Sequence, residues 1–319
     1  MSGPRLRPPR TRRSCASHSQ VTVLARERIR AAVGAEARRP PQPEVEALVE
    51  RLRERFGSAF AGALYYGSCR RQQQPDGIFD LHVVVSDLRS ALGPVGAVLC
   101  RALPPNVYYL ETEHGGTTVR CKYAVLSLDQ FHRGCSRGSF HAYFWARYAQ
   151  PVTVLAAPAP EQLVDGLVDA VETLAHRALP RLGAAPSWRA MWIGALQLCY
   201  QTELRPEGSD RAATLVDAQP AYFQQTGEAI LERRGDHDHD CVTVAARLDW
   251  AVRIALGKPL SVLRLAKGLY TFDGGIAYVA WKLERHAGRP IEIPERVRRW
   301  PLLFAWPFLW RLWRQRVIR

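Results

Sequence analysis

The spacing of apolar residues predicts alternating helices and strands in the first half of the chain. From Glu44 to Phe56 apolar residues recur at helical spacing, and Gly57 is typical of a helix end. Short apolar or β-rich runs indicate four strands, at 61–66, 78–85, 106–112 and 117–127. The last two flank Glu113-His114-Gly115-Gly116, which predicts a hairpin. We therefore expect a mixed sheet in this half.

The second half has helical patterns, so the chain as a whole is expected to be α+β. Helices are predicted at 161–179, 187–205 and 217–233. A Pro-rich joint at 39–43 separates an Arg-rich leader from the first helix. The expected divisions are a basic, disordered tail (1–42), a sheet domain (43–160), a helical domain (161–256) and a C-terminal segment (257–319).

The net charge favours an anionic partner. The chain has 319 residues, and 44 basic against 30 acidic residues leave it at +14, which suits a nucleotide, a nucleic acid or an anionic lipid surface without choosing among them. The seven cysteines are scattered with no C-x-x-C pair, so neither a zinc ribbon nor a disulfide framework is indicated. Residues 1–26 hold six arginines and no acid, which fits either a transit peptide or a disordered tail.

The C-terminus indicates contact with a membrane surface. No segment reaches the roughly 20 apolar residues of a transmembrane helix. Residues 298–319 intersperse tryptophans with arginines, a pattern typical of an interfacial segment on anionic lipid. The alternative is a helix packed on the protein itself or on another subunit.

One motif carries chemistry: Gly67-Ser68, eleven residues, then Asp80 near the start of an apolar strand. A glycine lets the backbone turn tightly, so that neighbouring N–H groups and Ser68 face the terminal phosphates of a nucleotide. Asp80 would hold Mg²⁺ against the same phosphates. The alternatives are an ordinary turn and a structural aspartate. A second carboxylate is common two residues on, but His82 stands there, and Glu111 is a weak substitute.

Several strings in one order resemble the mitochondrial-type phosphatidate cytidylyltransferase family, also described as the mitochondrial translocator assembly and maintenance family. They span roughly residues 60 to 285. The strings are Tyr66-Gly67-Ser68, Gly77-Ile78-Phe79-Asp80, Asn106-Val107-Tyr108-Tyr109, Lys122-Tyr123-Ala124-Val125-Leu126-Ser127, Tyr143-Phe144-Trp145-Ala146-Arg147 with Gln150-Pro151-Val152, Leu198-Cys199-Tyr200 with Glu203-Leu204-Arg205, and Leu263-Arg264 with Lys267-Gly268-Leu269-Tyr270-Thr271.

The resemblance implies a nucleotidyltransferase-like mixed-sheet domain, a helical winged-helix-like domain, and transfer of CMP from CTP to phosphatidic acid with Mg²⁺. The residues it marks as catalytic are Asp80, Lys122 and Glu203, with Asp80 also the metal ligand. Those it marks as binding nucleotide or phosphate are Tyr66, Gly67, Ser68, Arg147, Tyr200, Arg205, Lys267 and Gly268. A plain turn is the alternative for the last two. Cys69, Ala124 and Glu203 depart from the family pattern, and the region 233–255 looks shortened.

The sequence leaves other functions open. One alternative is a nucleotidyltransferase acting on RNA or a small molecule, although no aromatic–Gly motif of RNA-binding modules is present, so no nucleic-acid partner is expected. Another is a catalytically inactive membrane adaptor. The expected location is peripheral, on the cytoplasmic face of a bacterial inner membrane, with the matrix face of the mitochondrial inner membrane second. The run Asp236-His237-Asp238-His239-Asp240 is not expected to bind a metal.

Overall fold

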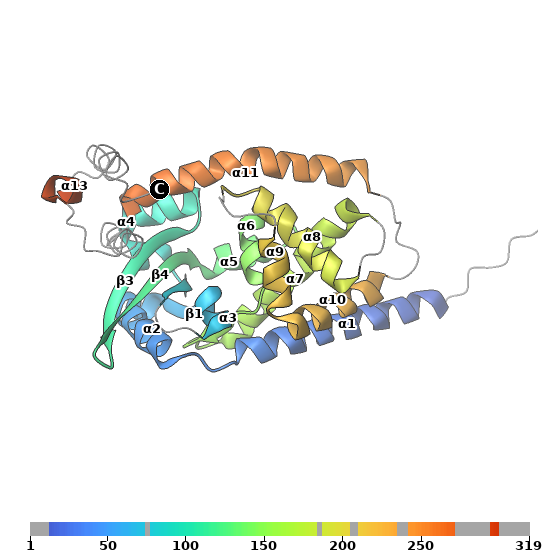
Figure 1. Ribbon diagram of the computed structural model, residues 1–319, viewed down its shortest axis with the longest axis horizontal. Coiled ribbons are helices and arrows are strands. Elements are labelled where there is room, and N and C mark those ends of the chain that lie inside the picture. Colours follow the sequence, from blue (N-terminus) through green and yellow to red (C-terminus); the bar gives the residue numbers. More distant parts are fainter. Residues whose placement is uncertain are drawn as a thin grey trace, which may run out of the picture.

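The computed structural model describes residues 13–73, 77–183, 187–204, 210–234, 242–271 and 294–299 (Figure 1). These residues form a five-stranded mixed sheet at one end of the molecule and a group of helices at the other, which confirms the α+β class. The strands are β1 (Phe60–Tyr66), β2 (Ile78–Val85), β3 (Asn106–His114), β4 (Thr117–Ser127) and β5 (Thr153–Leu155). The helices are α1 (Arg13–Ala37), α2 (Pro43–Phe56), α3 (Ser68–Gln72), α4 (Leu88–Ala102), α5 (Leu128–Cys135), α6 (Ala142–Tyr148), α7 (Pro160–Leu182), α8 (Trp188–Gln201), α9 (Arg211–Asp217), α10 (Pro220–Arg234), α11 (Val244–Thr271) and α13 (Glu295–Arg299).

The strand order is β3-β4-β2-β1-β5, with β2 and β4 parallel and the other neighbours antiparallel. All four predicted strands are confirmed to within two residues, while the three-residue β5 was not predicted. The hairpin between β3 and β4 is also confirmed. Its two loop residues, Gly115 and Gly116, have φ of 57° and 77°, as a tight two-residue turn requires.

Side chains alternate between two cores on the two faces of the sheet. Phe79, Leu81 and Tyr123 face a core that α2 and α4 help to build. On the other face, Val84 and Leu126 join a larger core shared with α5, α6 and α7. The second face therefore carries the junction between the sheet and the helices, and Asp80 belongs to this face because it alternates with Phe79.

The expectation of a disordered tail over residues 1–42 is wrong for residues 13–37, which form α1; residues 1–12 lie outside the described residues. Helix α1 packs along α7 and α10, and buries Ala25, Ile29 and Val33 against them. Its arginines are paired with acids of those helices: Arg26 with Asp169 and Glu172, Arg28 with Glu232, and Arg30 with Glu161 and Asp165. Composition alone missed these partners because they lie more than 130 residues away.

The helical half follows the predicted helices with three differences. Helix α8 ends at Gln201, and the segment predicted as a helix at 217–233 is α10, preceded by a short α9. Helix α11 was not predicted, and it runs unbroken across the expected boundary between 256 and 257. Lys267 and Gly268 are therefore helical, and the turn alternative for them is wrong.

Several sequence predictions fall outside the described residues. These are the Trp/Arg-rich end at 300–319, the Asp/His run at 236–240, and Arg205. In the described part of the chain, no helix is both long enough and apolar enough to cross a bilayer.

Candidate active site

Three predicted site residues, together with Tyr109, form a row across the sheet. Tyr109 of β3 is in register with Lys122 of β4, Lys122 with Asp80 of β2, and Asp80 with Tyr66 of β1. Register partners point to the same face, and neighbouring strands lie about 4.8 Å apart. The Lys122 strand thus lies directly beside the Asp80 strand. An ammonium and a carboxylate share one face of adjacent strands.

Gly67 follows the last residue of β1 and lies directly against Asp80. Its φ is 95°, in the region that favours glycine. A Cβ added at this position would lie 2.7 Å from Asp80 Oδ2. The absence of a side chain at Gly67 therefore keeps open the space beside the Asp80 carboxylate. Ser68 follows as the exposed first residue of α3.

His82 occupies the second-carboxylate position but is fully buried and committed to hydrogen bonds. Its Nε2 lies 3.0 Å from the hydroxyl of Tyr66, and its Nδ1 contacts the hydroxyl of Tyr148. Burial, with the nearby charges of Arg147 and Lys122, lowers the pKa of His82 well below its usual value. His82 is thus a neutral ring with both nitrogens engaged.

Glu111 does not supplement Asp80. It lies on β3, and β4 lies between β3 and the Asp80 strand. Two strand spacings, or roughly 10 Å, therefore separate the two strands. It accepts hydrogen bonds from Tyr109 Oη (2.6 Å) and Arg120 Nε (3.0 Å).

Among the described residues, no three His, Cys, Asp or Glu side chains come together in a way that could hold a metal ion. The donor set therefore fits Mg²⁺ only as the ion commonly binds in nucleotide sites, through one carboxylate together with substrate phosphates and water.

Arg71 adds a cation that no sequence motif indicated. It lies half-buried on α3, and burial lowers its pKa; Arg211 also lowers it, while Tyr200 and Asp80 raise it. Tyr200, one of the predicted residues, and Arg211 therefore lie close enough to Arg71 to act on its charge, as Asp80 does.

Arg147 and Glu203, predicted as separate site residues, form one buried pair. Arg147 Nη1 donates to Glu203 Oε1 (2.9 Å) and Nη2 to Oε2 (3.3 Å), and the side chains are only 14% and 10% exposed. The guanidinium also lies 3.6 Å from the ring centre of Tyr143. Burial is the largest influence and lowers the pKa of Arg147, but Glu203, Tyr143 and Tyr66 together raise it well above its usual range.

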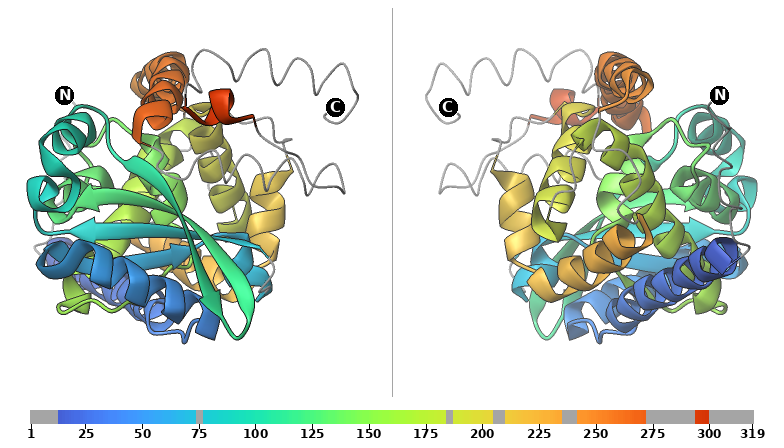
Figure 2. Two further views of the ribbon diagram at one scale, coloured as in Figure 1. Left: turned by 90° about the vertical axis from the view of Figure 1, so that its left-hand side faces the viewer. Right: turned by 90° about the vertical axis from the view of Figure 1, so that its right-hand side faces the viewer.

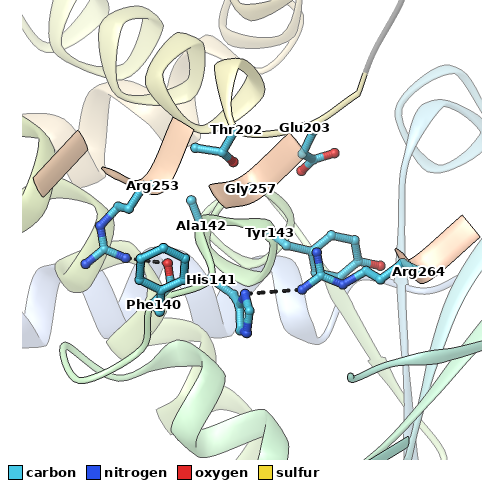
Figure 3. A pocket seen from close by; sticks show the side chains of 9 residues that line it. All are labelled: Phe140, His141, Ala142, Tyr143, Thr202, Glu203, Arg253, Gly257 and Arg264. Carbon is cyan, nitrogen blue, oxygen red and sulfur yellow. Dashed lines mark hydrogen bonds between the residues drawn. The ribbon is translucent and has the colours of Figure 1, made fainter. Parts of the chain in front are cut away.

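A small pocket opens beside this pair, between α6, the end of α8 and the inner face of α11 (Figure 3). Arg264 reaches into it across Tyr143, and its Nη2 lies 3.2 Å from His141 Nδ1. Burial and the arginines lower the pKa of His141 to about 4, so His141 is neutral near pH 7. The pocket is lined by Phe140, His141, Ala142, Tyr143, Thr202, Glu203, Arg253, Gly257 and Arg264.

Lys267 lies farther along α11 and fastens that helix to the loop before β3. Its Nζ donates to the carbonyl oxygens of Leu103 and, at 2.8 Å, Pro105. Burial lowers its pKa to about 8. A Cβ added at Gly268 would meet no other atom within 4 Å. The geometry gives Lys267 a clear anchoring role, while phosphate binding by either residue stays a prediction.

The cations missed from the sequence, Arg71 and Arg264, are part of this junction. Arg264 lay inside a string that resembled the family pattern, so its position held a signal. Arg71 follows the Gly-Ser turn by three residues, and no pattern in the sequence marks it. No protein-family model matches the sequence, and no curated protein was found to be similar to it.

Proposed function

We propose that the protein is a nucleotidyltransferase that transfers CMP from CTP to phosphatidic acid, giving CDP-diacylglycerol and pyrophosphate. The observation that carries this proposal is the registered pair of Asp80 and Lys122 beside Gly67. A carboxylate, an ammonium and a turn without a Cβ within one strand spacing suit a metal-bound triphosphate. The nearby guanidinium of Arg71 adds a further positive charge.

The reaction needs few groups from the protein. A phosphate oxygen of phosphatidic acid attacks the α-phosphorus of CTP, and the bond from that phosphorus to the bridging oxygen breaks, so that pyrophosphate leaves with the electron pair. A phosphate monoester is already anionic near pH 7, so no general base is required. Mg²⁺, held by Asp80, would offset negative charge on the phosphates. Lys122 attracts and orients a phosphate group, and Gly67 admits it close to the backbone.

The lipid substrate is supported by the order of the motifs and by the net charge of +14. The proposal includes the finer layout implied by the resemblance, a nucleotidyltransferase-like domain followed by a winged-helix-like one. After β5 the described residues form helices only, so the winged-helix layout depends on the resemblance. The proposed location is the cytoplasmic face of a bacterial inner membrane, with the mitochondrial matrix face as the alternative.

The test is to incubate the purified full chain with labelled CTP, Mg²⁺ and phosphatidic acid in mixed micelles. We expect labelled CDP-diacylglycerol to form and to be lost with Asp80→Asn. Label transferred to RNA or to a small-molecule acceptor instead would overturn the lipid substrate. If no acceptor is labelled but Asp80→Asn retains the cellular role of the protein, an inactive adaptor would replace the enzyme.

A further inference from the structure

Helix α11 carries an apolar face that is turned outward. Seven large apolar residues on it are between 49% and 71% exposed. They are Val244, Leu248, Val252, Leu256, Val262, Leu263 and Leu265. At 3.6 residues per turn, residues 244, 248, 252, 255, 259, 263 and 266 share one side of the helix. Ala255, Pro259 and Ala266 on this side are exposed as well, so the strip is apolar along about six turns.

The charges beside this strip all have one sign. The exposed charged residues of α11 in the described part of the chain are Arg247 and Lys258, which lie eleven residues, or three turns, apart on the same margin. The one acid of the helix, Asp249, is half-buried and paired with Arg253. An apolar face with a cationic margin and no exposed carboxylate complements an anionic lipid surface.

The opposite face of the same helix lines the candidate site. Arg253, Gly257 and Arg264 face the pocket that also contains Glu203 (Figure 3). Gly257 allows the helix to approach the backbone of Thr202, because a Cβ there would lie 2.4 Å from the carbonyl oxygen. One helix thickness therefore separates the outward strip from the pocket.

We infer that the outward face of α11 lies on the surface of an anionic bilayer and places the pocket beside the lipid headgroups. The inference rests on the proposed function, because a lipid substrate requires the protein to reach a membrane surface. It assigns the contact to α11, a different segment from the Trp/Arg-rich end.

The test measures binding of the full chain to sedimenting vesicles, without nucleotide, so that it does not depend on catalysis. The vesicles are phosphatidylcholine with or without phosphatidic acid. In Leu248→Asp/Leu256→Asp the partition coefficient should fall about tenfold or more, since two leucines no longer enter the interface. Arg247→Gln/Lys258→Gln should weaken binding only to the vesicles that contain phosphatidic acid, by about fivefold per cation.

A matched control lies on the other side of the molecule. Leu24 on α1 is 58% exposed, close to the 62% of Leu248, and α1 runs along the side opposite α11 (Figures 1 and 2). Leu24→Asp should leave vesicle binding unchanged. If the double aspartate variant does not fold, Val252→Trp serves in its place and should strengthen binding, because tryptophan favours the interface.

Wild-type binding by the double aspartate variant, or no gain with Val252→Trp, would overturn the inference. The inference would also be overturned if the wild-type chain were a dimer in size-exclusion chromatography and the double aspartate variant a monomer that still bound vesicles. A second copy of the chain, and not a bilayer, would then cover the strip. Absence of CDP-diacylglycerol with α11-dependent vesicle binding would refute only the proposed function. Product formation with α11-independent binding would refute only the inference.

Discussion

Replacing Glu203 with glutamine removes the charge that holds the buried guanidinium of Arg147. The two groups form two hydrogen bonds at 2.9 and 3.3 Å with side chains only 14% and 10% exposed. With charge centres about 4 Å apart and an effective dielectric constant of 20, their attraction is about 4 kcal/mol. Loss of one partner of a buried pair costs about 3–5 kcal/mol. We expect Glu203→Gln to lower the free energy of unfolding by that amount.

The assay is urea unfolding of a double-mutant cycle. Arg147→Met alone leaves Glu203 buried without its cation and should be as destabilising as Glu203→Gln alone. The double variant should cost much less than the sum of the two, because no uncompensated charge remains. The exposed pair of Arg189 and Asp217 is also joined by two hydrogen bonds, at 2.7 Å each, and supplies the control.

Asp217→Asn should have a far smaller effect than Glu203→Gln, because the control pair is screened by water. Two results would contradict a coupled buried pair. One is that the losses of unfolding free energy for Glu203→Gln and Arg147→Met simply add in the double variant; the other is that Glu203→Gln costs below about 1 kcal/mol, as for an exposed pair.

Three further predictions concern the sheet and α11. Gly67→Ala should cost about 1–3 kcal/mol of stability because φ is 95°, and it should also lower activity by moving Asp80; thermal unfolding and product assays measure the two effects. Gly257→Ala should cost about 1–3 kcal/mol in urea unfolding, since its Cβ meets the backbone of Thr202. Because the pKa of His82 is depressed, the unfolded chain binds a proton below about pH 6.5 that the folded chain does not. Stability should therefore fall by up to about 1.4 kcal/mol per pH unit below that value, and His82→Phe should flatten this part of the profile.

The strands, and the positions of Gly67 and Asp80 on them, were predictable from local sequence patterns. Alternating apolar runs bounded by Gly115 and Gly116 fixed the hairpin, and the Gly67–Asp80 spacing placed both residues at one end of neighbouring strands. What local pattern could not supply was the partner of each charged group. Arg147 and Glu203 are 56 positions apart, and each alone resembled a phosphate-binding or metal-binding residue.

Two larger elements were missed for related reasons. In α1 the arginines suggested disorder because their carboxylate partners come from α7 and α10, which only the folded chain brings near. Helix α11 has regular apolar spacing, but apart from the buried Trp250 seven of its large apolar residues face outward, so the usual assignment of an apolar face to the core does not apply. His82 likewise acquires its two tyrosine partners only through tertiary packing.

The most direct measurement of the central claim is calorimetric titration of CTP with and without Mg²⁺. The wild-type chain should bind CTP in a Mg²⁺-dependent manner, and Asp80→Asn should weaken that binding at least about tenfold, or about 1.4 kcal/mol. Asp87→Asn makes the same charge change just past the other end of β2, where asparagine preserves the helix cap, and should bind as the wild type does. Equal Mg²⁺-dependent affinity for the wild-type and Asp80→Asn proteins would contradict the account.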